Sequence, residues 1–189
     1  MSTTNNSAKV STGKPKVEGA VHRAALSSTL VLPSDATTAL ANDFAPLGYI
    51  SEDGVSETTN KSSSDIKAWG GDVVDVVQTE TGKTWKLKLI ESMNVDVLKT
   101  VFGDDNVSET SGKISISENC ADLDFAAWVI ETIMKGGRAQ RIVIPMGKII
   151  SIAEIVYKDN EAIGYEVEIK AVPDASGNYD YKYIAAPST

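Results

Sequence analysis

The sequence predicts a mainly β protein: an antiparallel β-sandwich or barrel with one flanking α-helix and one long extended loop. Three observations carry this prediction. Through most of the second half of the chain, apolar residues either alternate with polar ones or form runs of strand length. One segment alone combines helical spacing with a capping residue and a stop. A long polar stretch at 50–72 separates two apolar regions, and the sequence shows no internal repeat or heptad pattern.

The chain of 189 residues is long enough for one domain with a core of its own. Residues 1–16 are mostly small and polar, a composition that buries little apolar surface, so they predict a flexible N-terminal arm. We expect the β domain over residues 17–184, with the extended loop at 50–72, and a C-terminal tail at 185–189.

Short elements are expected before the loop. The apolar stretch 17–32 predicts one or two strands. Ser34 or Asp35 can cap a short helix that follows it. Residues 44–51 predict a further strand, which ends at the turn signal Glu-Asp-Gly of 52–54.

A β-hairpin is predicted over residues 69–92. Its first half is rich in valine, and its second half alternates apolar residues with lysines. Thr-Gly-Lys at 81–83 supplies the turn between these halves.

The helix is predicted over residues 95–102. Ser92 or Asn94 can accept the free amides of its first turn, and Gly103 ends it. The acidic stretch 104–106 that follows predicts a loop.

The remainder of the chain predicts successive strands joined by turns. In the stretch 162–172, Glu166 and Glu168 face away from the apolar side. Three tyrosines, Tyr179, Tyr181 and Tyr183, are expected to share one strand face. The predicted strand segments are 112–118, 124–134, 141–157, 162–172 and 178–185.

Composition excludes several classes of protein. The formal net charge of −8 argues against a protein that grips nucleic acid, since that affinity comes mostly from Lys and Arg on phosphates. It does not argue against a conduit through which nucleic acid passes. A single cysteine, Cys120, permits no intrachain disulfide and is expected to be a buried, inert thiol. No apolar run is long enough to span a bilayer and no signal peptide is present, so we expect synthesis in a cytosol.

No catalytic, cofactor or metal site is predicted. The phosphate-loop pattern is absent around Gly13, and the acidic turns at 52–53 and 104–106 lack the ligand spacing of a calcium loop. Asp122 and Asp124 could form an acid–base pair, but a solvated strand start is the simpler interpretation. With one histidine in the chain, we expect no enzyme and no cofactor.

Three stretches carry a family resemblance. Residues 48–55 read G-Y-I-S-E-D-G-V, residues 64–74 read S-D-I-K-A-W-G-G-D-V-V, and residues 89–107 read as a strand, a short helix and a V-F-G element. In this order they resemble the major tail proteins of long non-contractile-tailed bacteriophages, the proteins that form the tail tube.

The resemblance implies a β-sandwich that assembles into hexameric rings, stacked into a tube whose lumen is a β-barrel shared between subunits. It implies that the loop contacts neighbouring subunits through Asp65, Ile66 and Trp69, and that Gly70 and Gly71 turn it back into the sheet. Trp69 would then become buried only on assembly. The alternative is that Trp69 packs on its own domain.

The acidic balance fits the same interpretation. Acidic side chains that face a lumen would repel the DNA backbone, so that the genome slides without sticking. The candidates for this face are Asp122, Asp124, Glu166 and Glu168.

The resemblance also implies partners and a location. These partners are further copies of the chain, with tape measure, tail terminator and tail tip proteins, while DNA passes without specific binding and no membrane is involved. The expected location is the virion tail, and the host cytoplasm before assembly.

Two alternatives stay open. The first is a monomeric β-sandwich binding module for carbohydrate or adhesion, in which the tyrosine row would be the binding surface. The second is the tube protein of a contractile injection system, which shares the fold.

Overall fold

The computed structural model of the chain describes residues 5–17, 19–119 and 121–187. Cys120, the expected inert thiol, lies outside the described residues. The first residues of the expected arm (1–4) and the last of the expected tail (188–189) lie outside them as well.

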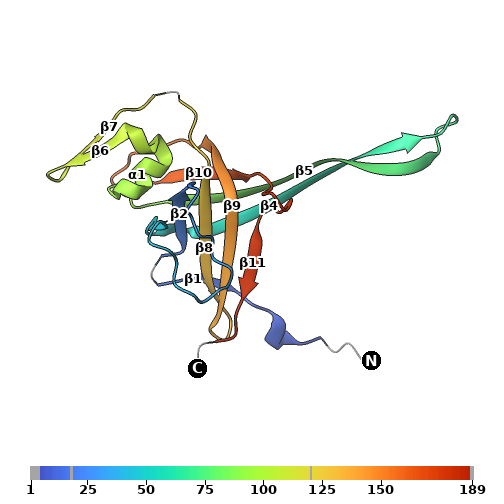
Figure 1. Ribbon diagram of the computed structural model, residues 1–189, viewed down its shortest axis with the longest axis horizontal. Helices are drawn as coiled ribbons and strands as arrows, with labels where there is room; N and C mark the ends of the chain where they lie inside the picture. The colour runs from blue at the N-terminus through green and yellow to red at the C-terminus, as the bar shows by residue number, and fades with distance from the viewer. Residues whose placement is uncertain (1–4, 18, 120, 188–189) are drawn as a thin grey trace.

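One nine-stranded antiparallel sheet forms the body of the molecule (Figure 1). A separate sheet of two strands and a single α-helix lie beside it. The sheet order is β3 (Ala45–Pro46), β2 (Val21–Ala25), β8 (Ala126–Met134), β9 (Arg138–Ile152), β10 (Tyr165–Ala171), β5 (Val73–Leu89) and β4 (Ile50–Lys67), with β1 (Gly13–Pro15) on β8 and β11 (Tyr181–Ile184) on β9. The remaining elements are the pair β6 (Val107–Thr110) and β7 (Lys113–Ile116), helix α1 (Val95–Phe102), and 3-10 turns at Ser7–Lys9 and Asp104–Asn106.

The predicted class is confirmed: the protein is mainly β, its strand pairs are antiparallel, and it has one α-helix in the described residues. The strand order is open, with β3 and β4 at its ends, so the sheet does not close into a barrel. Strands β8 and β9 cross the direction of β4 and β5, so the bent sheet encloses its main core (Figure 1).

The main core lies between the inner sheet face and α1. Trp85 and Trp128 are its largest side chains, and both are fully buried. Trp128 donates its indole N–H to the carbonyl oxygen of Gly147 at 3.1 Å. A Cβ at Gly147 would lie 2.9 Å from a methyl group of Ile169 and 3.0 Å from the indole, so this packing requires glycine.

Helix α1 has the predicted bounds, because its signals are local. The Asn94 side chain accepts a hydrogen bond from the amide of Asp96, and the amide of Gly103 donates to Lys99 at the other end. Gly103 has φ of 101°, a conformation that favours glycine. The buried face of the helix closes one side of the main core.

The short helix predicted after Asp35 is wrong: the chain runs through bends there. Asp35 does cap, since its carboxylate accepts from the amides of Thr37 and Thr38 at 2.7 and 2.6 Å. Arg141 then donates to the carbonyl oxygens of Asp35 and Thr38, both at 2.8 Å. In a helix, these carbonyl oxygens would accept backbone hydrogen bonds. Here they accept from the guanidinium of Arg141 instead.

Arg141 is fully buried and directly opposite Glu131 in the β8–β9 ladder. Its guanidinium lies 2.6 Å from the Glu131 carboxylate, which also receives Lys16 at 3.2 Å. The pair thus anchors residues 26–44 over the outer face of β8 and β9, where Phe44 and Val143 belong to a second, smaller core.

The hairpin predicted over 69–92 is also wrong in its turn. Strand β5 continues through Thr-Gly-Lys at 81–83, and its partner β4 comes from the expected loop. The turn signal at 52–54 likewise lies within β4, where the register shifts between Ile50 and Val55. Both glycine signals therefore mark positions inside strands, and the reversal occurs at 68–72.

The structure also differs from the sequence predictions in three short segments. Among the described residues of the stretch 17–32, only Val21–Ala25 form a strand. Residues 13–15 of the expected arm pair with β8, so the end of this arm is docked on the sheet. The acidic stretch 104–106, predicted as a loop, is a 3-10 turn. Across the described residues, no helix has the length and apolarity to cross a membrane.

Candidate assembly interface

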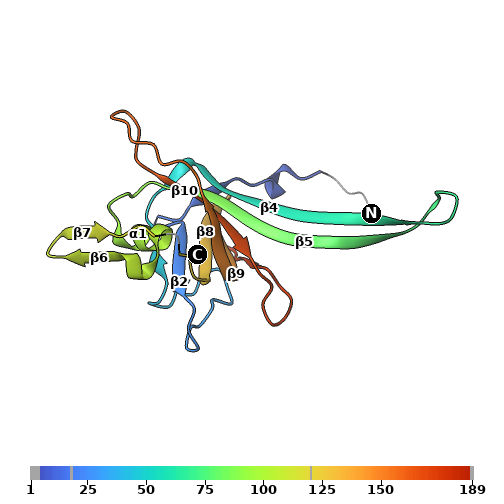
Figure 2. The same ribbon diagram turned by 90° about the horizontal axis from the view of Figure 1, so that it is seen from above.

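The β4–β5 arm, residues 56–81, projects far beyond the body as a two-stranded ribbon (Figures 1 and 2). Every residue of the arm is exposed. Residues 50–72, expected as a loop, are therefore one strand and the turn of a long hairpin. A two-stranded ribbon without a packed face is marginally stable in water on its own.

The end of the arm carries Trp69, which is fully exposed. The alternative in which Trp69 packs on its own domain is wrong. The turn is closed by the amide of Ala68, which donates to Asp72 at 2.8 Å. Gly70 and Gly71 have φ of 129° and 100°, conformations that a side chain would strain.

Apolar side chains occupy both faces of the arm near its end. Ile66 lies opposite Asp75, whereas Asp65 lies opposite Val76 on the other face. No single face of the arm could therefore bury them all against one flat surface. We call this set the apolar tip: Ile66, Trp69, Val73, Val74, Val76 and Val77, each at least 44% exposed. Contiguous exposed apolar groups of this kind mark interaction sites.

An ion cluster fixes the root of the arm. Lys83 Nζ lies 2.8 Å from Glu57 and 2.5 Å from Asp180. Lys182 reaches the other oxygen of Glu57 at 2.5 Å. Burial alone would raise the pKa of Glu57, but hydrogen bonds from Lys182 and Lys83 outweigh it and hold this pKa below its ordinary value. The cluster joins both arm strands to β11 and thereby sets the direction in which the arm leaves the body.

The tyrosine row does not form one face. Tyr179 packs against the main core and donates its hydroxyl to the carbonyl oxygen of Thr81 at 3.1 Å. Tyr181 and Tyr183 stack with ring centroids 6.5 Å apart and pack on the second core. The Tyr181 hydroxyl donates to Asp174 at 2.6 Å and thereby lowers the pKa of that carboxyl. These rings are engaged within the chain, which removes the surface that a carbohydrate-binding module would need.

The four acidic candidates lie in two places. Glu166 and Glu168 are on the outward face of β10, directly opposite Lys88 and Lys86 of β5. Lys86 forms an ion pair with Glu166. The two glutamates neutralise these neighbouring lysines, and Lys170 farther along the same face lies opposite Lys148 of β9.

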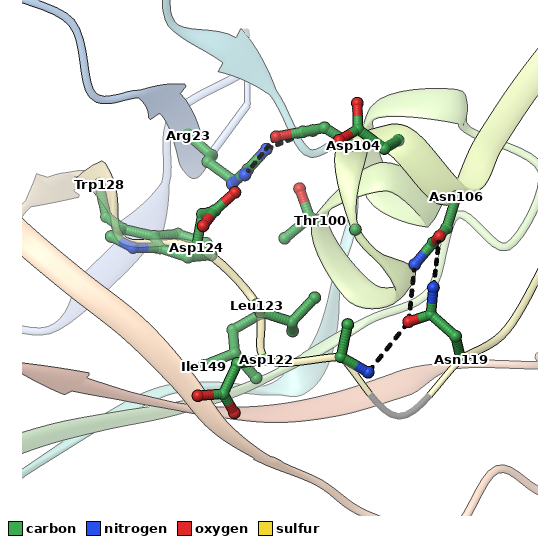
Figure 3. Close-up of a pocket in the computed structure, with 13 residues that line it drawn as sticks. Arg23, Thr100, Asp104, Asn106, Asn119, Asp122, Leu123, Asp124, Trp128 and Ile149 are labelled. Carbon is green, nitrogen blue, oxygen red and sulfur yellow. Dashed lines mark hydrogen bonds and ion pairs between the residues drawn. The ribbon is translucent and has the colours of Figure 1, made fainter.

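Asp122 and Asp124 line a pocket of about 180 Å³ beside α1. Asp122 pairs with Lys148 at 2.9 Å. Asp124 lies beside Arg23, whose guanidinium binds both oxygens of Asp104 at 2.9 and 2.8 Å (Figure 3). The two aspartates thus have separate surroundings, and the described residues contain no cluster of His, Cys, Asp and Glu fit for a metal ion.

Sequence reasoning missed the root cluster, the Glu131–Arg141 pair and the valines of the tip as a set. The partners of Lys83 and Lys182 are 97 and 125 residues away in sequence, so no local signal could have indicated them. The valines were visible as a run, but only the register with β4 shows that both faces of this run are exposed.

A family model described as phage tail tube protein matches residues 2–187. Among solved structures, a chain of the "Cryo-EM structure of the anti-feeding prophage cap (AFP tube terminating cap)" has a TM-score of 0.47 and 8% sequence identity, over 85% of this chain and 95% of that chain. A search of curated proteins gives no match.

Proposed function

Since the chain belongs to the phage tail tube protein family, which makes it a structural protein of a phage tail, we propose that its copies assemble into stacked hexameric rings that form the tail tube. The lumen of this tube conducts the genome into the host. The chain does this without catalysis, cofactor or metal, by binding to further copies of itself.

The observation that carries this proposal is the β4–β5 arm. Its apolar tip is exposed on both faces and lies far from the core of its own chain. Transfer of such side chains out of water stabilises a complex by about 25 cal/mol per Å² buried. A neighbouring copy offers that burial, and Asp65, Ile66 and Trp69 are the proposed contacts on the arm.

The open sheet supports the same proposal. The order from β3 to β4 leaves an end strand on each side, and such edges invite pairing with other chains. Pairing around a ring would cover these edges. Stacking of rings leaves the top and bottom open, which allows growth into a tube.

The lumen is proposed to be lined by the outward face of β10, with Asp122 and Asp124 at its border. Glu166 and Glu168 cancel the charge of Lys88 and Lys86 on that face. A lumen without net positive charge releases no counterions from DNA and therefore does not hold it.

The remaining proposals concern location, partners and tail type, and membership of the tail tube family supports them. We place the protein in the virion tail and, before assembly, in the host cytoplasm. Tape measure, tail terminator and tail tip proteins are its proposed partners at assembly, and the tail is of the non-contractile type. A tube within a contractile system is the competing assignment.

Negative-stain electron microscopy of the concentrated protein, with sedimentation velocity on the same sample, tests the proposal. Rings or hollow tubes of constant diameter are the expected result. A monomer of 20.1 kDa at every concentration, also after addition of a tail tip complex, would contradict it.

A further inference from the structure

We propose that the apolar tip of one copy docks into a groove between α1 and the C-terminal half of β9 on a second copy. This inference rests on the proposed assembly and adds the receiving surface to it. The groove is a cavity of about 220 Å³. Its apolar lining is Val101, Phe102, Leu123, Ile149, Ile150 and Ile152, and Glu118, Asn119, Asp122 and Ser151 line it as well.

The groove exposes apolar side chains where the rest of the sheet buries them. Ile150 is 51% and Ile152 is 39% exposed, although both belong to a strand whose earlier residues are mostly buried. The cavity is smaller than the range of about 300–1,000 Å³ that is typical of small-molecule sites. It suits one or two inserted side chains better than a free ligand.

The groove also offers an unpaired strand edge. Strand β8 begins at Ala126, which pairs with Gly147, while β9 continues to Ile152. In the described structure, residues 148, 149, 151 and 152 thus pair with β10 alone, and Ile150 lies at a register shift without a β10 partner. An extended segment could add to this edge and place alternate side chains in the groove.

The arm also has an unpaired strand edge. Strand β10 pairs with β5 only from Lys83 onward, so residues 73–82 of β5 pair with β4 alone. The free edge of the arm therefore carries the valines of the apolar tip. Two free edges with apolar side chains are complementary in the way that β-augmentation requires.

The tip cannot reach its own groove. The arm extends from one side of the body, and α1 lies on the other (Figures 1 and 2). About ten residues at 3.3 Å each place the tip roughly 30 Å beyond the body. A contact between different surfaces of two copies is heterologous, and such contacts produce closed rings or filaments.

The apolar area that the tip could bury is smaller than a full protein–protein interface. Trp69 and the five partly exposed aliphatic side chains offer roughly 400 Å². An interface of standard size buries about 800 Å² per partner. One or two of these side chains inserted in the groove therefore supply only part of a stable pair interface, and the flank of the arm and the multiplicity of contacts in an assembly supply the rest.

Charge does not drive this contact. The end of the arm carries Asp65, Asp72 and Asp75 against Lys67. The groove has Glu118 and Asp122 at its border, against Lys148. Both surfaces are net acidic, so added salt should screen their repulsion and strengthen the contact.

Cross-linking between single-cysteine variants tests the docking. In a Cys120→Ser background, Ala68→Cys places a thiol at the tip and Ile150→Cys places one in the groove of a separate protein. Val31→Cys is the matched control, since Val31 is an exposed β-branched residue on the segment that covers the opposite sheet face. Mixed pairs are treated with a short bismaleimide and analysed by gel, in parallel with microscopy and at about 0.1 and 0.5 M salt.

We expect the 68–150 pair to cross-link about tenfold or more above the 68–31 pair, because docking raises the effective concentration of the two thiols. We also expect the yield to rise with salt. Rings or tubes that form without preferential 68–150 cross-links would overturn the groove and leave the tube proposal standing. Cross-links at 68–150 without rings would support the groove and contradict the ring. A yield that falls with salt would show that charge attraction holds the two surfaces together and would overturn the apolar contact.

Discussion

The body and the arm of this protein are built from continuous strands of the same sheet. The body buries its large apolar side chains, however, and the arm exposes them. In the body, Trp85 and Trp128 are buried, and Trp128 has a hydrogen-bond partner for its indole. On the arm, Trp69 is fully exposed and the valines around it face water on both sides. The body therefore buries its apolar side chains within the monomer, whereas the arm leaves its own exposed, as interaction sites do.

The comparison also shows how β5 changes its role along one strand. From Lys83 to Leu89 it lies between β4 and β10, and its inward side chains fill the core. From Val73 to Gly82 it has β4 as its only partner. The ion cluster at Lys83 lies where β5 passes from one partner strand to two.

The largest effect is expected in the body, from Arg141→Met. This change leaves the buried Glu131 with Lys16 as its remaining ion-pair partner and removes the donor to the carbonyl oxygens of Asp35 and Thr38. We expect a loss of about 3–5 kcal/mol in the free energy of unfolding, measured by urea denaturation. Arg138→Met, at an exposed position of the same strand, is the control and should change this free energy by less than about 0.5 kcal/mol. Equal losses in both variants would contradict the anchoring role of Arg141.

The second effect separates the arm from the body. Trp69→Ala should leave the free energy of unfolding within about 0.5 kcal/mol of wild type, because the side chain has no contact in the monomer. It should abolish tube formation or raise the required protein concentration by roughly 25-fold, the effect of losing an interface anchor worth about 2 kcal/mol. Microscopy and sedimentation measure this.

Tyr49→Ala is the matched control for that variant, since Tyr49 is an exposed aromatic residue on the body. It should assemble as wild type does. Tubes of normal yield from Trp69→Ala would remove the arm from the assembly interface.

A smaller effect is expected at the root. Glu57→Gln should lower the free energy of unfolding by about 1 kcal/mol or less at pH 7, because a partly exposed ion cluster is screened by water. The pKa of Glu57 is lowered in the folded protein, so its contribution is present above the ordinary value of 4.5 and is lost as pH falls through the lowered value. The difference between wild type and variant should therefore shrink toward zero on acidification. A difference that persists or grows at low pH would contradict this assignment.

The smallest effect concerns DNA. The double change Glu166→Gln and Glu168→Gln removes the carboxylates that lie opposite Lys88 and Lys86, while Glu161 stays paired with Lys88. We expect weak DNA binding to appear, with log affinity falling by about 0.9 per neutralised phosphate for each tenfold rise in salt. Fluorescence anisotropy with assembled particles measures it, and Glu52→Gln with Asp53→Asn is the charge-matched control. Unchanged, undetectable binding would remove the β10 face from the lumen.

The elements that the sequence could predict are those with local causes. Helix α1 has both its cap and its glycine stop within ten residues, and β10 shows its inward and outward sides by simple alternation. The helix after Asp35 failed because Arg141, more than a hundred residues later, takes its carbonyl oxygens. Helix propensity and capping depend on neighbouring residues, whereas the hydrogen bonds from the buried Arg141 depend on the tertiary fold.

The arm illustrates the same limit. Thr-Gly-Lys at 81–83 is a good hairpin signal on its own, but Lys83 binds Glu57 and Asp180, and this long-range cluster keeps the strand straight. The importance of Trp69 and of the glycines after it was available from the family resemblance. The exposure of both faces of the tip, and the groove that could receive it, required the register of the sheet.

Acrylamide quenching of tryptophan fluorescence tests the central claim most directly, that the arm tip is exposed in the monomer and buried in the assembly. The chain has three tryptophans, and the two in the body are buried. In dilute protein, Trp69 should supply the quenchable emission, and Trp69→Phe should remove it. On concentration into rings or tubes, the quenchable fraction of the wild-type protein should disappear. If Trp69 stays fully quenchable in assembled particles, the arm is not the assembly element and the account is contradicted.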